Sequence, residues 1–511
     1  MRSLIKRRPQ EIARGPITMA IMLATLMNTL DSTIANVALP HIQGSLSASP
    51  DQIAWVLTSY IVAAAMVTPA SGWLAVRIGM KRMFLVAILG FTVSSMLCGV
   101  ATSLPQLVIF RLLQGGFGAF TLPLSQAVLL DINPPSDHAR AMSLWAMGTI
   151  LGPILGPVIG GYITEEYSWR WCFYINLPIG LVAALGVWIF MPPSKDTPSR
   201  RFDFLGFGSL IVMVAALQLM LDRGASQDWF SSTEIWTEAL VALAAFWIFV
   251  SHTVSTPHPF IDMSLMRDRN LLGTSVFGFL AQSVMFGSLA ILPIIMQSLM
   301  GYPVLTSGVV SMPRGLAMML TMWVAPRLTQ QLGQRITLVS GLALNAASIW
   351  IMMHFDLAMD TRLLVISGAM QGAATGIMYV PMTTLAFATV QPALRAEAAA
   401  MFNLFRTIGG SLGISIMQAL ATRNAQVMHS SMAAQVAPAD PVLHWALARA
   451  FSPETTTGAL ALDAEINRQA TMVAYIDDFR LMFALCLLCA PCVLLLRASK
   501  APPDPAHAVM E

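Results

Sequence analysis

The chain has 511 residues, of which 56% are hydrophobic and only 11% are charged, with a net charge of +3. Soluble domains carry roughly 25% charged residues, and a soluble fold of this length needs a hydrated shell that so few charges cannot form. The mean hydropathy of +0.68 points the same way, so the composition predicts an all-α polytopic membrane protein. A transmembrane β-barrel is disfavoured, because the apolar stretches run for about 20 residues without alternation.

Basic residues at the start of the chain predict how it is anchored. Arg2, Lys6, Arg7, Arg8 and Arg14 precede the first apolar run, and no small-residue cleavage pattern follows that run. A removed signal peptide is therefore disfavoured. We expect the charged start to be a cytoplasmic anchor.

Fourteen apolar segments follow, and they predict fourteen membrane-spanning helices. These segments cover residues 17–37, 52–75, 83–101, 105–130, 141–163, 171–191, 204–221, 236–251, 271–297, 304–326, 336–354, 363–389, 398–421 and 479–496. An even number places both termini on one side. Nineteen Lys and Arg residues lie on the N-terminal side of these spans, whereas the short loops opposite hold only Arg170, Arg223 and Arg362. This asymmetry predicts that both termini are cytoplasmic.

Two hydrophilic stretches divide the predicted spans. Residues 192–203 close the sixth span with proline and charge, and predict a cytoplasmic linker. Residues 422–476 predict an external loop of about 55 residues, with a helix around 459–476. A loop of that length is usually functional or partner-binding, and a tolerated insertion is the alternative.

The predicted organisation has five parts. They are a cytoplasmic N-terminus, a first six-helix half, a linker with two extra spans, a second six-helix half that includes the external loop, and a cytoplasmic tail. Their predicted bounds are residues 1–16, 17–191, 192–270, 271–497 and 498–511.

An internal repeat is the basis for two similar halves. Four positions of the fourth and fifth spans recur at an offset of 257 residues: Gln114, Gly115, Gly152 and Gly156 correspond to Gln371, Gly372, Gly409 and Gly413. Two positions around the turn after the second span recur at an offset of 254: Leu74 and Gly79 correspond to Leu328 and Gly333. Many secondary transporters are built from two such halves around a site near the bilayer midplane.

Two opposite charges within the membrane interior need an explanation, because intramembrane charges are costly. Asp31 lies about 14 residues into the first span and Arg111 about six residues into the fourth span from the outside. At 1.5 Å per residue, both lie roughly 21 Å from the inner face of a core about 30 Å thick. An ion pair is predicted, with a carboxylate that gains and loses a proton as its partner moves. A purely structural pair, or snorkelling to the outer interface, is the alternative.

The two halves differ at the position of Arg111, as the repeat shows. Arg111 corresponds to Gly368, so the second half lacks that arginine. This difference favours a specialised role in the first half over a packing role that both halves share. The second half has other buried polar residues, and together with Gln114 they are candidates to line a cavity or to hold it together: Arg314, Asn403 and Arg406.

Glycines recur in the fifth span and occur on both sides of the turn after the second span. Gly148, Gly152, Gly156 and Gly160 recur every four residues, which gives one smooth helical face for close helix packing. The interior prolines of this span, Pro153 and Pro157, predict a kink or local rigidity. Small-residue packing alone is the simpler interpretation.

The turn after the second span reads GWLAVRIGMKR and contains Gly72, Gly79 and Arg82. Its charges are explained by orientation in the membrane. The spaced glycines add the hypothesis of a gating contact.

Several functions are disfavoured by what the sequence lacks. It has no Gly-Lys-Ser/Thr phosphate-binding motif, so intrinsic ATP drive is not expected. The five cysteines lie in or beside apolar runs and the eight histidines are scattered, so neither a disulfide framework nor a metal site is predicted. No clustered nucleophile or acid–base group indicates an enzyme, and we expect no catalytic residues.

These motifs, taken in order, resemble a known family. The chain is similar to the major facilitator superfamily, in particular its fourteen-span drug:proton antiporter branch and the EmrB-type multidrug exporters within it. The resemblance is carried by LDSTIANVALP in the first span, GWLAVRIGMKR after the second, RLLQGG in the fourth, the glycine–proline series of the fifth, and LDRGASQDWFSS at 221–232.

The resemblance implies proton-driven export of lipophilic compounds by alternating access, without a cofactor other than the coupling proton. It assigns proton coupling to Asp31 and Arg111. It also assigns an antiporter motif to Gly148, Gly152, Gly156, Pro157, Gly160 and Gly161. One departure is Val76, where the superfamily's loop motif commonly has an acidic residue, so a charge-based gate at this loop is in doubt.

The resemblance also implies partners and a location. EmrB-type exporters work with a periplasmic adaptor protein and an outer-membrane channel, which implies the inner membrane of a Gram-negative cell and no nucleic-acid partner. The alternative function is a dedicated exporter of a single metabolite or another carrier of this superfamily. Substrate identity does not follow from the sequence.

Overall fold

The computed structural model describes residues 14–193, 203–257, 259–435 and 455–496 of the chain. Throughout these residues the regular structure is helical. Twelve helices are long and apolar enough to cross a membrane, or up to thirteen when one bent pair counts as a single span. The all-α membrane fold is thus confirmed, whereas the count of fourteen spans stays a prediction.

The long and short helices of the first half together cover the first six predicted apolar segments. Its elements are α1 (Arg14–Leu46), α2 (Pro50–Ile53), α3 (Trp55–Val67), α4 (Ala70–Ile78), α5 (Met80–Val100), α6 (Leu104–Gly118), α7 (Thr121–Ile132), α8 (His138–Glu166), α9 (Trp171–Tyr174) and α10 (Asn176–Phe190). Helices α3 and α4 are bent by 61° relative to each other. Pro69 lies at this break and lacks the backbone N–H that a continuous helix would use.

The second half repeats this plan. Its elements are α14 (Arg269–Ile294), the π-helical turn η4 (Ile295–Leu299), α15 (Val304–Leu332), α16 (Gln334–Met352), α17 (Thr361–Phe387), α18 (Arg395–Gln435) and α19 (Thr456–Leu495). Helix α1 packs on α8 and α10 as α14 packs on α18 and α19, and α3 packs on α6 as α15 packs on α17. Equivalent helix pairs therefore build both halves, as the sequence repeat predicts.

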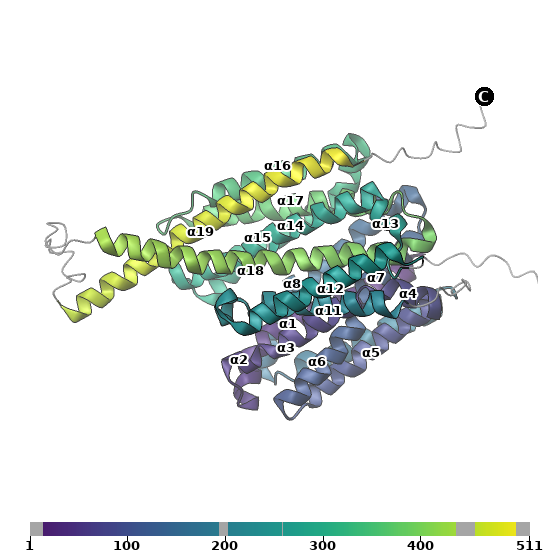
Figure 1. The fold of residues 1–511 in the computed structure, drawn as a ribbon, viewed down its shortest axis with the longest axis horizontal. Coiled ribbons are helices and arrows are strands. Elements are labelled where there is room, and N and C mark those ends of the chain that lie inside the picture. The colour runs from purple at the N-terminus through teal and green to yellow at the C-terminus, as the bar shows by residue number, and fades with distance from the viewer. Residues whose placement is uncertain (1–13, 194–202, 258, 436–454, 497–511) are drawn as a thin grey trace, which may run out of the picture.

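Two further helices lie between the halves in the chain and beside both in space (Figure 1). They are α11 (Phe204–Arg223) and α12 (Thr233–Ser255), and α11 packs against α3 and against α18. Gln218 of α11 donates to Ser411 over 3.0 Å, and Ser415 donates to the Leu221 carbonyl over 2.8 Å. Hydrogen bonds between α11 and α18 therefore attach the inserted pair to the second half.

The ends of α18 and α19 project beyond the rest of the bundle (Figure 1). They cover most of the stretch 422–476 that is predicted as an external loop, because α18 continues to Gln435 and α19 begins at Thr456. The predicted helix around 459–476 is thus confirmed. His429 and Asp463 join the two projecting ends over 2.9 Å. Residues 436–454 lie outside the described part of the chain.

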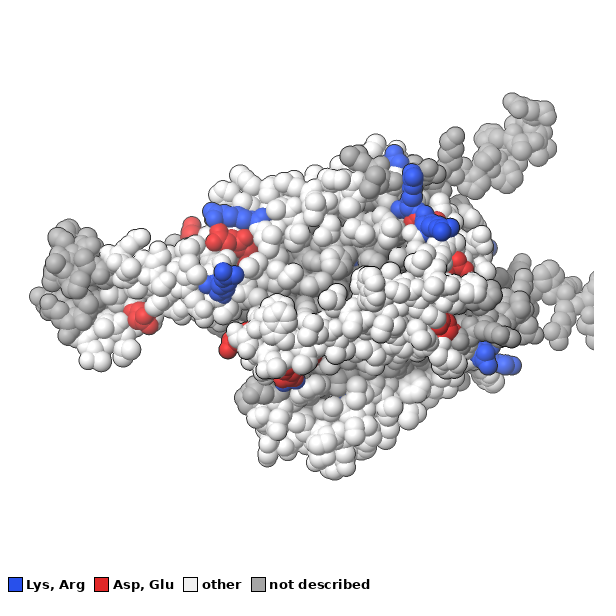
Figure 2. Space-filling model, viewed as in Figure 1, with Lys and Arg blue, Asp and Glu red and all other residues white. Residues whose placement is uncertain are grey.

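Charge follows the long axis of the molecule. On the face shown in Figure 2, Lys, Arg, Asp and Glu gather toward the two ends, and a wide middle region has none of them at the surface. An uncharged belt of this kind suits the hydrocarbon core of a bilayer. The core between the helices contains buried side chains such as Phe84, Phe91, Phe277 and Phe402.

Candidate functional site

The acidic residue of the first span lies inside the first half. Asp31, on α1, is 1% exposed, and Arg111, on α6, is fully buried. The guanidinium Nη1 donates to the Asp31 Oδ2 atom over 2.6 Å. The ion pair predicted from the depth of the two residues is therefore present, and its part in proton coupling stays a prediction.

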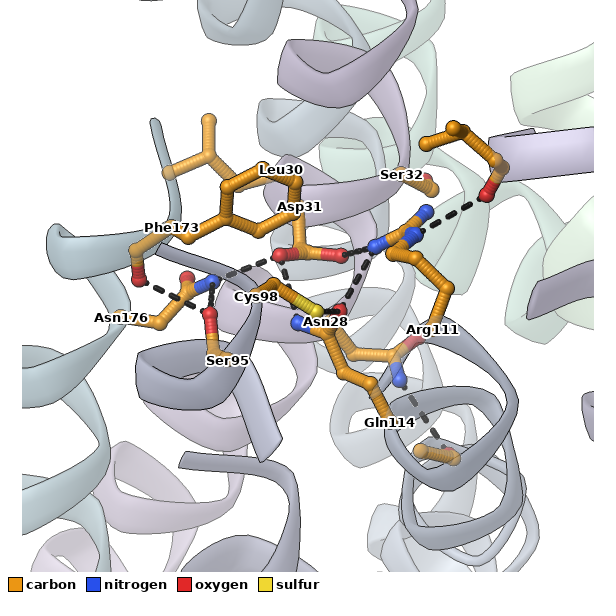
Figure 3. Close-up of polar contacts among 12 residues, drawn as sticks. Asn28, Leu30, Asp31, Ser32, Ser95, Cys98, Arg111, Gln114, Phe173 and Asn176 are labelled. Carbon is orange, nitrogen blue, oxygen red and sulfur yellow. Dashed lines mark hydrogen bonds and ion pairs between the residues drawn. The ribbon is translucent and has the colours of Figure 1, made fainter. Parts of the chain in front are cut away.

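Two amide side chains surround the same carboxylate (Figure 3). Gln114 Nε2 and Asn176 Nδ2 both donate to Asp31 Oδ1, over 2.8 and 2.7 Å. Arg111 also donates to Gln114 Oε1 over 2.8 Å, and its Nε donates to the Val56 carbonyl over 3.1 Å. Side chains of α6 and α10 thus converge on the carboxylate of α1, and α3 supplies a carbonyl to Arg111.

Aromatic rings and unused polar atoms complete this cluster. The Arg111 Cζ atom lies 4.3 Å from the ring centroid of Tyr60 and 5.7 Å from that of Phe173. Arg111 Nη2 and Asn176 Oδ1 are buried without a hydrogen-bond partner in the described part of the chain. The cluster therefore keeps one unused donor and one unused acceptor beside the ion pair.

The glycine face of α8 positions the helix that holds Asp31. A Cβ atom at Gly152 would lie 2.3 Å from Thr29 Oγ1, and one at Gly156 would lie 2.1 Å from Thr33 Oγ1. Thr33 also donates to the Gly152 carbonyl over 3.1 Å. Both threonines lie within one turn of Asp31 on α1, so these glycines set the distance between α8 and the acidic helix.

The remaining positions of the antiporter motif are less tightly packed. A Cβ atom at Gly148 or Gly160 would meet its nearest neighbour at 3.5 or 3.4 Å, and one at Gly161 would meet nothing within 4 Å. Pro157 lies within α8, and its side chain lies outside the described part of the chain. The close contact is therefore concentrated at two of the predicted glycines.

Polar contacts join the two halves at the predicted cytoplasmic end. They pair Asn403 with Gln126, Ser143 with the Met322 carbonyl and Arg395 with Asp131, over 2.7, 2.5 and 2.7 Å. The ring of Tyr379, on α17, also stacks on that of Trp145, on α8, with centroids 6.2 Å apart. The structure is therefore closed between the halves at this end.

The loop motif lies beside this closure. A Cβ atom at Gly72 would lie 2.7 Å from the backbone of Glu397 in the second half, so α4 and α18 approach closely there. Gly79 joins α4 to α5 with a φ of +93°, a conformation that favours glycine. Arg82 is exposed at the start of α5. The ion pair between the halves uses Asp131 and Arg395, which lie outside this motif.

The four residues predicted to line a cavity fall into three groups, because Asn403 and Arg406 lie one turn apart on α18. Gln114 belongs to the Asp31 cluster, and Asn403 lies at the contact between the halves. Arg406 donates to the Tyr379 hydroxyl over 2.9 Å. Arg314 donates to Ser288 and to the Met285 carbonyl.

Sequence reasoning missed Asn176, Asp131 and Arg395. Asn176 is a single amide within the apolar run 171–191, and that isolation is a signal that could have identified it. Asp131 and Arg395 lie at the ends of apolar segments, where charged residues are common, so only their contact in space shows that they form a pair. Among the described residues, no group of three or more His, Cys, Asp or Glu could hold a metal ion.

Comparisons with known proteins agree with this architecture. Residues 21–414 match the family model described as Major Facilitator Superfamily. The chain is 36% identical over 439 residues to the multidrug export protein EmrB of Escherichia coli (strain K12), which covers 85% of this chain and 86% of that protein. It is 32% identical over 429 residues to the fatty acid resistance protein FarB of Neisseria gonorrhoeae, which covers 84% and 85%.

A solved structure extends the likeness to the fold. The human organic anion transporter MFSD10 (TETRAN) has a TM-score of 0.59 to this chain at 14% sequence identity, and the match covers 94% of this chain and 100% of that one. At such low identity the likeness concerns the fold alone.

Proposed function

Because this chain belongs to the Major Facilitator Superfamily, we propose that it is a proton-coupled exporter of hydrophobic or amphipathic toxic compounds. Its family makes it a membrane transporter and not an enzyme. The similarity to EmrB supports multidrug export, and the similarity to FarB supports substrates with both an apolar and a polar part. The observation that carries the coupling is the buried pair of Asp31 and Arg111.

Protonation of Asp31 changes what holds the first half together. The negative charge of the Asp31 carboxylate compensates the buried Arg111 guanidinium. A proton that reaches Asp31 removes that charge and leaves Arg111 as an uncompensated buried cation, which is strongly unfavourable. Proton binding therefore favours a different arrangement of α1 and α6.

The contacts of α8 connect this change to the closure between the halves. Gly152 and Gly156 pack α8 on α1 around Asp31, and Ser143 of the same helix donates to the second half. A shift of α1 relative to α6 thus alters the helix that closes the predicted cytoplasmic end. Alternating access follows if the proton binds the two conformations with different affinity.

The test uses purified protein in liposomes with a pH-sensitive dye and a panel of lipophilic compounds. We expect several compounds to dissipate an imposed proton gradient through the wild type and none to do so through Asp31→Asn. Asp360→Asn is the matched control, since it removes a carboxylate that is 66% exposed. Substrate-driven proton flux through Asp31→Asn at the wild-type rate would overturn the coupling role.

The range of compounds separates multidrug export from the alternative of a dedicated carrier. A multidrug exporter responds to several unrelated lipophilic compounds in this assay. A response to one compound only, with the same dependence on Asp31, would favour the dedicated carrier and would contradict multidrug export.

We propose further that the projecting ends of α18 and α19 bind a periplasmic adaptor that leads to an outer-membrane channel, with the exporter in the inner membrane. The resemblance to EmrB-type exporters and the projection itself support this partner. Glu465 and Arg468 of α19 form an ion pair over 2.8 Å, and hydrogen bonds from Arg468 and Gln469 lower the pKa of the Glu465 carboxyl. Replacing residues 424–470 with a short linker should abolish copurification of the adaptor, and retained copurification would contradict the proposal.

A further inference from the structure

The second half contains a polar cluster that the coupling mechanism does not use. Ser288, on α14, donates to Gln371 Oε1, on α17, over 3.0 Å. Arg314, on α15, donates from Nη2 to Ser288 Oγ over 3.3 Å and to the Met285 carbonyl over 3.2 Å. We call Ser288, Arg314 and Gln371 the second-half cluster.

The second-half cluster occupies the place that corresponds to the Asp31 cluster. Ser288 lies 257 residues after Asp31, the offset that also relates Gln114 to Gln371. In both halves the two hydrogen-bonded residues are 83 positions apart. The serine therefore stands where the first half has its buried carboxylate.

The cation has changed helices between the halves. Arg314 lies 254 residues after Tyr60, the offset that relates Gly79 to Gly333. The packing agrees, since a Cβ at Gly115 would lie 2.3 Å from the Tyr60 carbonyl and one at Gly372 would lie 1.9 Å from the Arg314 carbonyl. The second half thus keeps a guanidinium but supplies it from the other helix of the pair.

The position of Arg111 is occupied by Gly368 in the second half. A Cβ atom placed there would meet only the Arg314 Cβ, at 3.7 Å, among the described atoms within 4 Å. The glycine therefore leaves space beside Arg314 where the first half holds an arginine side chain.

The second-half cluster has more hydrogen-bond donors than acceptors. In the part of the chain that the structure describes, Arg314 forms no ion pair, and its hydrogen bonds all come from Nη2. Gln371 is fully buried, and its Nε2 atom has no hydrogen-bond partner among the described residues. A buried donor without an acceptor is unfavourable, and the partly exposed Arg314 guanidinium keeps donors that a ligand can reach. A single oxyanion can accept from both residues.

We propose that the second-half cluster binds the carboxylate head of an amphipathic anionic substrate, which fills the place that Asp31 fills in the first half. A guanidinium offers a carboxylate a fork of parallel donors, and Gln371 Nε2 adds another. Arg314 is partly exposed, and so are Met318 and Met319 about one turn further along α15. Methionine side chains adapt to varied apolar groups, so they suit the tail of such a compound.

This inference rests on the proposed export function for the statement that the anion is a substrate, and the binding itself can be measured without transport. The probes are dodecanoate and dodecyltrimethylammonium, which share a chain length and differ in the charge of the head. Binding to the full-length protein in lipid nanodiscs is measured by tryptophan fluorescence, with empty nanodiscs as the blank.

We expect Arg314→Gln to weaken dodecanoate binding by at least about tenfold, the loss expected when a charged hydrogen-bonding partner is removed. Binding of dodecyltrimethylammonium should change by less than about twofold, since that head needs no cation. Asp360→Asn, which removes a carboxylate that is 66% exposed and lies outside both clusters, should leave dodecanoate binding near the wild-type value. Failure of the wild type to bind dodecanoate, or equal binding by Arg314→Gln, would overturn the proposal.

Ser288→Asp provides a second test that does not leave a buried charge unpaired. The new carboxylate lies beside Arg314 and supplies its counter-charge, so the folded protein should be at least as stable as the wild type. We expect dodecanoate binding to be lost in this variant, because the place of the ligand carboxylate is taken. Wild-type affinity in a folded Ser288→Asp protein would overturn the site.

The liposome assay separates this inference from the proposed function. If dodecyltrimethylammonium drives proton flux through Arg314→Gln and dodecanoate drives none through it, the result supports both the export proposal and the anion site. If dodecanoate binds as described and no compound drives proton flux through the wild type, the export proposal fails and the anion site stands. If cationic compounds drive flux and dodecanoate binds no variant, the anion site fails and the export proposal stands.

Discussion

The first and second halves pack equivalent helix pairs, and they differ in the charge at equivalent positions. In the first half, Asp31 and Arg111 neutralise each other and are buried. In the second half, Ser288 replaces the acid and Arg314 supplies the cation from the neighbouring helix. The backbone plan is therefore symmetric, whereas the chemistry is not.

This difference indicates how one fold can separate two tasks. A neutral buried pair changes its state when a proton arrives, so it suits coupling. A cation that lacks a counter-charge changes its state when an anion arrives, so it suits a ligand. The proposed coupling site and the proposed anion site therefore occupy equivalent places of one helix packing and differ in a few side chains.

The largest effect is expected when the ion pair of Asp31 and Arg111 is broken. Asp31→Asn and Arg111→Gln should each lower the free energy of unfolding by about 3–5 kcal/mol, because each leaves one buried charge alone. The double variant should lose less than the sum of the two, yet its substrate-driven proton flux should remain absent. Chemical denaturation of the purified proteins measures the first quantity and the liposome assay the second.

Additive losses in that double-mutant cycle would mean that the two side chains act independently, which contradicts a functional pair. Recovery of proton flux together with stability would assign coupling to another group.

A smaller effect tests whether the glycine contacts are equivalent in the two halves. Gly156→Ala puts a Cβ 2.1 Å from Thr33 Oγ1, and Gly413→Ala puts one 2.2 Å from the Ser283 carbonyl. Each should destabilise the protein by about 1–3 kcal/mol through overpacking. Gly161→Ala, with nothing within 4 Å, is the control and should stay within about 0.5 kcal/mol of the wild type.

Thermal unfolding of the three alanine variants decides this point. Only Gly156→Ala should also slow export, since α8 reaches both Asp31 and the contact between the halves. An equal loss of export in Gly413→Ala, measured at equal amounts of folded protein, would show that the halves are not specialised in this respect.

The smallest effect concerns the ion pair between the halves. Asp131→Asn should shift the balance away from closure at the predicted cytoplasmic end by about 0.2–1 kcal/mol, since the Asp131 side chain is 43% exposed and such pairs are weak. The charge-exchanged variant, Asp131→Arg with Arg395→Asp, should restore the wild-type balance. Distances between spin labels at Arg82 and Gln331, in a cysteine-free background, report the shift.

An unchanged distance distribution in Asp131→Asn would assign the closure to the other contacts, such as Asn403 with Gln126. Failure of the exchanged pair to restore the balance would mean that the two charges act separately.

Much of the fold follows from the sequence, because apolar length and the repeat are local or periodic signals. The halves, the inserted helices and the pairing of Asp31 with Arg111 could be predicted from helix rise and from offsets between repeated glycines. The helical extension of α18 and α19 was harder to predict, because the polar and alanine-rich composition of 422–476 is compatible with both helix and loop.

The sites were predictable only where a residue was unusual for its segment. A charge inside an apolar span is conspicuous, so Asp31 and Arg111 were evident and Arg314 was a candidate. Asn176 and Gln126 belong to the site only through hydrogen bonds to residues on other helices, and no pattern along the chain predicts those partners. The exchange of the cation between α15 and α17 likewise needed the packing of Gly372 on Arg314.

The position of α11 has a consequence for compounds that are dissolved in the lipid itself. The halves meet along two seams, one where α4 meets α18 and one where α8 meets α15. Since α11 packs on both α3 and α18, the first seam is screened by the inserted pair. A lipophilic molecule that diffuses sideways through the bilayer therefore meets the inserted pair at the first seam, whereas at the second seam it meets α8 and α15 themselves.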